Sequence, residues 1–137
     1  MFDLSNTALS KAVDGGTFMP FLDPASGEPY RDEAGVPQGI TLRSRLSQAG
    51  QKFQRQQADK RLEMARRGQE TSVESLEAET TELLVACTVD WTFTHLDGAD
   101  FPCNEANARK FWSDTRFRSH RERANGWVGN EANFTKR

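Results

Sequence analysis

The densest apolar stretch of the chain runs from Leu83 to Phe117 and contains its sharpest turn signals. Leading into it, apolar or small residues recur every three or four positions, which is the spacing of one face of an α-helix. The stripe consists of Leu76, Thr80, Leu83, Leu84 and Cys87. The pattern predicts an amphipathic helix that ends near Cys87, with glutamates mostly on its other faces. We expect the rest of the chain to be arranged around this stretch.

A long polar helix is predicted before it, over residues 48–67. Ser47 is a good N-cap residue, and Gly68 ends the helix. The following helix starts at a T-x-x-E capping box in residues 71–74. Because the polar helix has only a thin apolar face, it should project, pair with a partner or fray. The acidic outer face of the second helix suits an antiparallel hairpin with the basic first helix, at roughly 0–1 kcal/mol for each exposed ion pair.

Turn and cap signals continue through the central stretch. Asp97 and Gly98 predict a turn in which the glycine takes a positive φ. Asn104 is a good N-cap, because its side-chain oxygen can accept from a backbone N–H near Asn107. The helix that follows presents one apolar face, made of Ala108, Phe111 and Trp112.

The last helix is predicted over residues 114–125. Residues 113–115 supply its cap, and Gly126 and Gly129 should loosen its end.

The N-terminal part has a different pattern. Residues 1–15 predict a flexible arm or a short helix, and residues 16–46 a small antiparallel β meander of two or three strands, one of them short and near residues 29–31. Four prolines between residues 20 and 37 rule out a large regular sheet, because each removes a ladder donor.

The predicted fold class is therefore α+β. A small N-terminal antiparallel β meander precedes a mainly α-helical region of about four helices, residues 47–137, in one compact domain. A chain of 137 residues is normally one domain.

Composition narrows the class of protein. Apolar residues make up 36% and charged residues 28% of the chain, and no apolar run approaches the roughly 20 residues of a membrane span. No membrane partner is therefore expected. The first residues do not resemble a secretory signal, so Cys87 and Cys103 are interpreted as reduced thiols of a cytoplasmic protein.

The net charge of −2 conceals a strong segregation of charge. Residues 1–46 carry −2, residues 47–69 carry +4, residues 70–100 carry −8 and residues 101–137 carry +4. Either the segments lie against one another, or each presents a charged face to a partner. The basic helix disfavours a nucleic-acid partner, because its cations are spread around it and only Phe53 accompanies them for base stacking.

No standard catalytic constellation is present. Zinc ligands would have to come from Cys87, His95, Cys103 and His120, which lack any CxxC or HxxxH pair. Cys87 lies on the apolar stripe of an acidic helix, which should raise its pKa rather than activate it. The chain also lacks a phosphate-binding glycine loop. We therefore predict no catalytic, cofactor or metal residues, and a non-enzymatic binding or assembly role.

Aromatic side chains are then the best candidates for contacts with a partner or for self-association. Which of them belong to the core stays open at this point. The candidates are Phe53, Trp91, Phe111, Trp112, Phe117, Trp127 and Phe134.

The order of motifs resembles the tail assembly chaperones of long-tailed, siphovirus-like bacteriophages. Residues 23–29 (DPASGEP) precede GITL at 39–42, an Arg-rich helix, LLVACT at 83–88 with Trp91, LDG at 96–98, FP at 101–102, NEA at 104–106 and a closing Asn-Phe. The resemblance covers nearly the whole chain from about residue 16. Residues 118–123 are more basic than the closing helix of that family.

The resemblance implies a protein that binds the tape measure protein, keeps it soluble and recruits tail tube subunits during tail morphogenesis. It implies the host bacterial cytoplasm as location, absence from the finished particle and, in many members, a longer frameshifted form. Two alternatives are a structural virion protein of the tail or head, and a small phage regulator or inhibitor that binds nucleic acid or a host protein.

Overall fold

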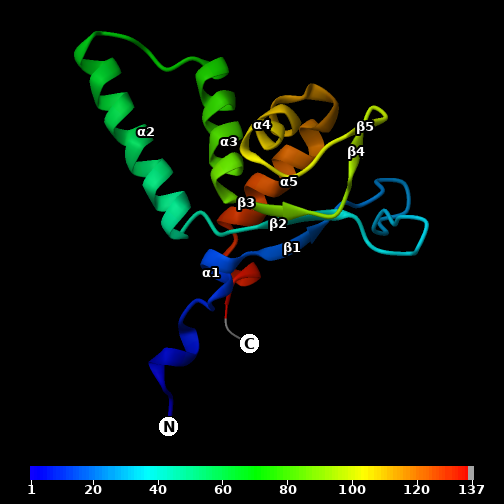
Figure 1. Ribbon diagram of the computed structural model, residues 1–137. Coiled ribbons are helices and arrows are strands. Elements are labelled where there is room, and N and C mark those ends of the chain that lie inside the picture. The colour runs from blue at the N-terminus through cyan, green and yellow to red at the C-terminus, as the bar shows by residue number, and fades with distance from the viewer. Residues whose placement is uncertain (136–137) are drawn as a thin grey trace.

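Three antiparallel strands form a sheet, and helices pack along one of its faces (Figure 1). The computed structural model describes residues 1–135. The elements in chain order are η1 (Leu4–Thr7), α1 (Ala12–Gly15), β1 (Thr17–Pro20), β2 (Gly39–Leu42), α2 (Gln48–Arg66), α3 (Val73–Cys87), β3 (Thr88–Trp91), β4 (His95–Leu96), β5 (Ala99–Asp100), α4 (Glu105–Ser113), η2 (Thr115–Phe117), α5 (Arg118–Gly129) and η3 (Glu131–Asn133).

The sheet has β2 at its centre, with β1 and β3 antiparallel on its two sides. Directly opposite residues share a face of a sheet, and here Met19, Ile40 and Trp91 form one row across all three strands. Each of these side chains is at most 8% exposed. This row is the floor on which the helices pack, and the α+β class predicted from the sequence is confirmed.

The order of strands corrects one expectation. The sheet is not completed within residues 16–46, because its third strand, β3, follows α3 without a loop. Around Pro29 there are only isolated bridges, Leu22 with Pro29 and Arg31 with Pro37. The prolines explain this difference, since a residue without an N–H cannot extend a ladder. The region after residue 47 also contains the small β4–β5 hairpin, so it is less uniformly helical than expected.

The first fifteen residues form η1 and α1, which agrees with the short helix that was one of the two expectations for this segment. Ser10 donates from its backbone N–H and its hydroxyl to the Phe134 carbonyl, at 2.7 and 2.8 Å. The Asp14 carboxylate accepts from the N–H of Gln48 at 2.8 Å. The second half of this segment is therefore tied to the beginning of α2 and to the end of the chain, while its first residues point away from the body (Figure 1).

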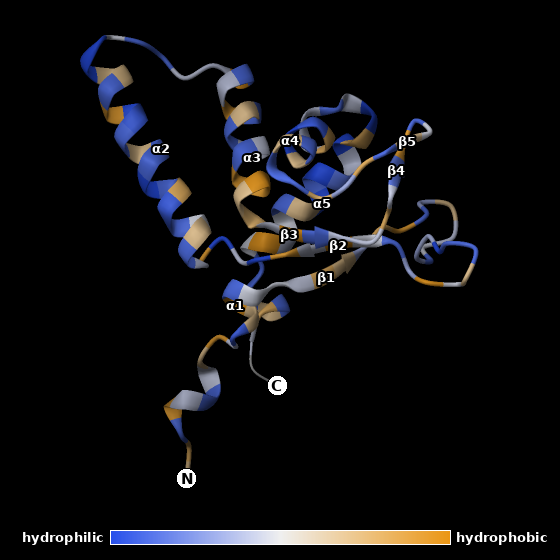
Figure 2. Ribbon diagram, viewed as in Figure 1, coloured by the Kyte–Doolittle hydropathy of each residue, from blue (hydrophilic) through white to orange (hydrophobic). Residues whose placement is uncertain are grey.

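Helix α3 is the centre of the helical layer, since α2, α4 and α5 all pack against it. Figure 2 shows hydrophobic colour gathered where α3 meets the sheet, and mostly hydrophilic colour along α2. The buried side chains of the layer come from α3, α4 and α5, and they are Leu83, Leu84, Cys87, Ala108, Phe111, Trp112, Ala124 and Val128. The predicted apolar face of α4 is thus confirmed.

Of the four predicted caps, two are confirmed, one is displaced, and the fourth was wrong, because Asp114 caps η2 while α5 begins at Arg118 with no side-chain cap among the described residues. The Ser47 hydroxyl accepts from the N–H of Gly50 at 3.0 Å, and the Asn104 side chain accepts from the N–H of Asn107 at 2.8 Å. The capping residue of α3 is Ser72, not Thr71, and it accepts from the N–H of Ser75 at 3.1 Å. The T-x-x-E box was therefore placed one residue too early.

The end of α5 also differs from the prediction. The helix continues through Gly126 to Gly129. Ala124 and Val128 on its inner face are both at most 1% exposed, so burial of this face outweighs the cost of about 1 kcal/mol for a glycine inside a helix.

Candidate functional site

Helices α2 and α3 form an antiparallel hairpin that is closed at the sheet and open toward its connecting loop (Figure 1). The closed end depends on Gly50, because a Cβ there would lie 2.8 Å from the carbonyl carbon of Arg45. The hairpin turns at Gly68, whose φ of +70° suits a glycine. Arg61 of α2 forms an ion pair with Glu79 of α3. The hairpin predicted from the charge pattern is therefore confirmed.

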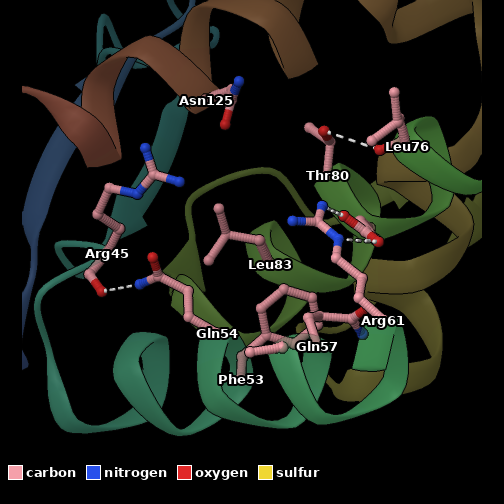
Figure 3. Close-up of a pocket in the computed structure, with 11 residues that line it drawn as sticks. Arg45, Phe53, Gln54, Gln57, Arg61, Leu76, Thr80, Leu83 and Asn125 are labelled. Carbon is pink, nitrogen blue, oxygen red and sulfur yellow. Dashed lines mark hydrogen bonds and ion pairs between the residues drawn. The ribbon is translucent and has the colours of Figure 1, made fainter. Parts of the chain in front are cut away.

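Between the diverging helices lies a cleft of about 380 Å³ (Figure 3). Leu83 at 5% exposure lies on its floor and Leu76 at 47% exposure on its wall. The residues that line it are Arg45, Phe53, Gln54, Gln57, Ala58, Arg61, Leu76, Glu79, Thr80, Leu83 and Asn125. The cleft thus combines an apolar floor with a polar rim, as binding sites for amphipathic groups do.

Part of the polar rim is already hydrogen-bonded within the protein. The Gln54 amide donates to the Arg45 carbonyl at 2.8 Å, and the Thr80 hydroxyl donates to the Leu76 carbonyl at 3.2 Å. Thr80 was expected in the apolar stripe of α3, and it is half-buried here because the first half of α3 faces this cleft rather than the core. The stripe is therefore confirmed only from Leu83 onward.

The segregated charges meet one another inside the fold. Carboxylates of α3 pair with arginines from three neighbouring helices: Glu79 with Arg61, Glu82 with Arg109 at 2.7 Å, and Glu77 with Arg118 at 3.7 Å. The hydrogen bonds from Arg109 hold the pKa of Glu82 below its usual value. Of the two interpretations of the charge pattern, the packing of the segments against one another is the one that the structure shows.

Four of the seven candidate interaction residues lie in the core. Their side chains are at most 8% exposed, so as folded they offer almost no area to a partner and act in packing. They are Trp91, Phe111, Trp112 and Phe134.

The other three candidates are half-buried, and they lie in different places. Phe53 lines the α2–α3 cleft. The indole N–H of Trp127 donates to the Thr17 hydroxyl at 2.9 Å and fastens α5 to β1. Phe117 stacks at 6.1 Å from the His120 ring. The structure therefore does not bring the predicted aromatics together into one surface.

A second hollow, of about 260 Å³, opens in an aromatic cluster beside the β4–β5 hairpin. His120 stacks on Phe21 there with ring centroids 4.3 Å apart. Burial and the nearby Arg123 hold the pKa of His120 below its usual value. At the rim, Arg116 makes a bidentate ion pair with Asp97 of the hairpin turn, at 2.8 and 2.9 Å. This ion pair holds the turn of the β4–β5 hairpin. The turn predicted at Asp97 and Gly98 is confirmed, and both residues have positive φ.

The two cysteines have the properties of packed side chains rather than of reactive thiols. Burial raises the pKa of Cys87 to about 11 and also raises that of Cys103, so neither is set up as a nucleophile. Within residues 1–135, no three His, Cys, Asp or Glu side chains gather at a spacing that could hold a metal ion. None of the helices described in that range is both long enough and apolar enough to cross a membrane.

Exposed apolar residues of the hairpin were missed by the sequence reasoning, which favoured aromatics. Leu62 is 60%, Val73 is 72% and Leu76 is 47% exposed. The sequence did contain a signal for this exposed surface, because a helix as polar as α2 was expected to project, pair with a partner or fray.

Comparison with known proteins gives no relative: no protein-family model, no curated protein and no solved structure matches this chain.

Proposed function

We propose that the protein is a tail assembly chaperone of a long-tailed bacteriophage, which binds the tape measure protein and holds it in solution while tail tube subunits are recruited. It acts in the cytoplasm of the host bacterium, makes and breaks no covalent bond, and is absent from the mature particle. The order of sequence motifs suggested this function, and one feature of the structure supports it.

That feature is the open α2–α3 cleft. A tape measure protein is long and helical, and its apolar stripes need cover until the tube encloses them. The cleft offers Phe53 and Leu76 beside polar groups, above a floor at Leu83, which suits an amphipathic helix laid into a groove. The cleft is open, and among the described residues a single ion pair, Arg61 with Glu79, links its two helices. A helix bound there can therefore be released when tube subunits compete for it.

Co-expression with the tape measure protein of the same genome tests the proposal. We expect a soluble complex that co-purifies with the chain, and an insoluble tape measure protein when the chain is absent. A tape measure protein that stays insoluble despite excess chain would overturn the proposal. Recovery of the chain in stoichiometric amounts from purified particles would instead support a structural virion protein.

Two exposed leucines of the hairpin make a matched pair for locating the binding site. Leu76→Glu places a charge on the wall of the cleft, whereas Leu62→Glu makes the same change on α2 outside the lining. We expect only Leu76→Glu to reduce the amount of soluble tape measure protein. Equal effects of the two variants would exclude the cleft as the contact surface.

A further inference from the structure

Arg45 lines the cleft and, unlike several arginines around the hairpin, has no ion pair within the part of the chain that the structure describes. Arg61, Arg109, Arg116 and Arg118 each pair with at least one carboxylate. For Arg45, no carboxylate partner is found among residues 1–135, and Figure 3 shows its guanidinium directed into the cleft toward Asn125. The cleft therefore contains one uncompensated positive charge.

The backbone of Arg45 is held firmly in place. Its N–H donates to the Val128 carbonyl at 2.9 Å, and its carbonyl accepts from the Gln54 amide at 2.8 Å. Its side chain passes along the end of α5, where a Cβ on Gly129 would lie 3.5 Å from a guanidinium nitrogen. A cation at a helix C-terminus is favourable, and the Arg45 guanidinium donates no hydrogen bond within the described residues.

Two side-chain amides add donors to the lining of the cleft. The side-chain amides of Gln57 and Asn125 form no hydrogen bond within the described part of the chain. The other cation of the cleft, Arg61, is neutralised by Glu79. The lining of the cleft thus combines a guanidinium on an anchored backbone with two amides that have no partner among the described residues, and the apolar side chains Phe53 and Leu76 lie beside them.

We propose that the cleft binds one amphipathic helix of the tape measure protein, and that an Asp or Glu on that helix pairs with Arg45. The apolar stripe of the helix inserts its side chains between α2 and α3, because a hollow of about 380 Å³ admits side chains rather than a whole helix. The carboxylate fixes the register of the stripe, since a guanidinium binds a carboxylate in a bidentate, directional way. This inference rests on the proposed function and adds the chemistry of the segment that is recognised.

Charge complementarity decides between occupants. The charged groups that line the cleft are Arg45, Arg61 and Glu79, and the last two pair with each other, so the cleft itself favours an acidic group. A phosphate backbone is the less suitable occupant, because it has no apolar stripe to cover Phe53 and Leu76. A second copy of this chain is the remaining alternative, and light scattering with and without the tape measure protein distinguishes it.

The test compares variants of Arg45 in the full chain, co-purified with the tape measure protein. Arg45→Glu should weaken the complex by roughly tenfold or more, the scale of a close charge pair at an interface. Arg45→Lys should weaken it less, since it keeps the charge and loses only the bidentate geometry. Arg55→Glu makes the same charge reversal on the exposed part of α2 outside the cleft, and should change binding by less than about twofold.

Rescue by a reversed charge on the partner separates recognition from a structural role. Overlapping peptides of the tape measure protein identify the bound segment, and its acidic residues are changed to Arg one at a time. One of these changes should restore binding to Arg45→Glu while weakening binding to the unaltered chain. Circular dichroism of each variant checks that it folds, and Arg45→Gln replaces Arg45→Glu if the latter does not.

The outcomes for the two proposals are separable. If the unaltered chain forms no complex with the tape measure protein, the proposed function fails. If it forms a complex that Arg45→Glu leaves unchanged, or that no charge reversal restores, the role of Arg45 is refuted while the chaperone function stands. A complex that the variant breaks only by dissociating copies of this chain would also refute it.

Discussion

Replacing Trp112 by alanine separates packing from partner contact at the residue where the two interpretations differ most. Its side chain is fully buried, and its ring meets that of Phe111 at an interplanar angle of 64° with centroids 4.7 Å apart. Its indole N–H donates to the Thr88 hydroxyl at 3.0 Å, which joins α4 to the start of β3. Trp112→Ala therefore removes a ring and a hydrogen bond from the junction of helix layer and sheet.

The expected loss follows from these two contributions. Truncation of a fully buried tryptophan costs about 3–5 kcal/mol. The lost hydrogen bond adds about 1 kcal/mol, because the Thr88 hydroxyl still donates to the Leu84 carbonyl and loses only one donor. The free energy of unfolding should fall by about 4–6 kcal/mol, which is a large part of the 5–15 kcal/mol typical of a domain. Trp112→Phe should lose only about 1–2 kcal/mol, since it keeps most of the ring.

Urea unfolding followed by far-UV circular dichroism measures the change, and tape measure binding is assayed under conditions where the variants are folded. Leu62→Ala is the control, because an exposed side chain contributes little and should change stability by less than about 0.5 kcal/mol. A loss below about 1 kcal/mol in Trp112→Ala, together with loss of binding, would refute the assignment of Trp112 to the core.

Three further changes test the fold, one in the sheet, one at the start of α2 and one in the aromatic cluster. Gly39→Ala should lower the free energy of unfolding in urea by about 1–3 kcal/mol or more, because the new methyl group would collide with the backbone of β1. Gly35→Ala is not a suitable control, because the positive φ of Gly35 itself disfavours alanine. Ser47→Ala should lower the free energy of unfolding in urea by about 1 kcal/mol through loss of the α2 cap, and Ser47→Asp should not restore it, because Ser47 is fully buried and a carboxylate there would lose its hydration. Because burial lowers the pKa of His120, the unfolded chain binds more protons than the folded chain just below about pH 6.5, so stability should fall on acidification there. His120→Phe should weaken this dependence between about pH 7 and pH 5, and an unchanged slope would contradict the reasoning.

The helices were predictable because their signals are local. A cap such as Ser47 or Asn104 acts within three residues, and the stripe that ends at Cys87 needs only the period of one helix. The turn at Asp97 and Gly98 was equally accessible, since few residues take a positive φ easily. All of these signals are local, and none depends on a distant part of the chain.

The third strand and the role of the aromatics were not predictable in the same way. Residues 88–91 become a strand because β2 lies beside them, more than forty positions earlier in the chain. Trp112 and Trp127 both lie near the C-terminal end of a helix, yet one is fully buried and the other half-exposed. Burial depends on which elements pack together, so composition alone could not assign seven aromatics to core or surface.

The segregated charges bear on both the fold and the choice of partner. Most of the acidic excess of residues 70–100 is on α3 and the loops around it, and arginines of α2, α4, η2 and α5 pair with it inside the molecule. Those cations are therefore not evidence for an acidic partner, although the sequence alone suggests it. A partner is instead indicated by the cations that remain unpaired in the described chain. Of these, Arg45 lines the cleft, beside its apolar floor. A site with that combination selects a carboxylate that is attached to an apolar surface, which an amphipathic helix supplies and a nucleic acid does not.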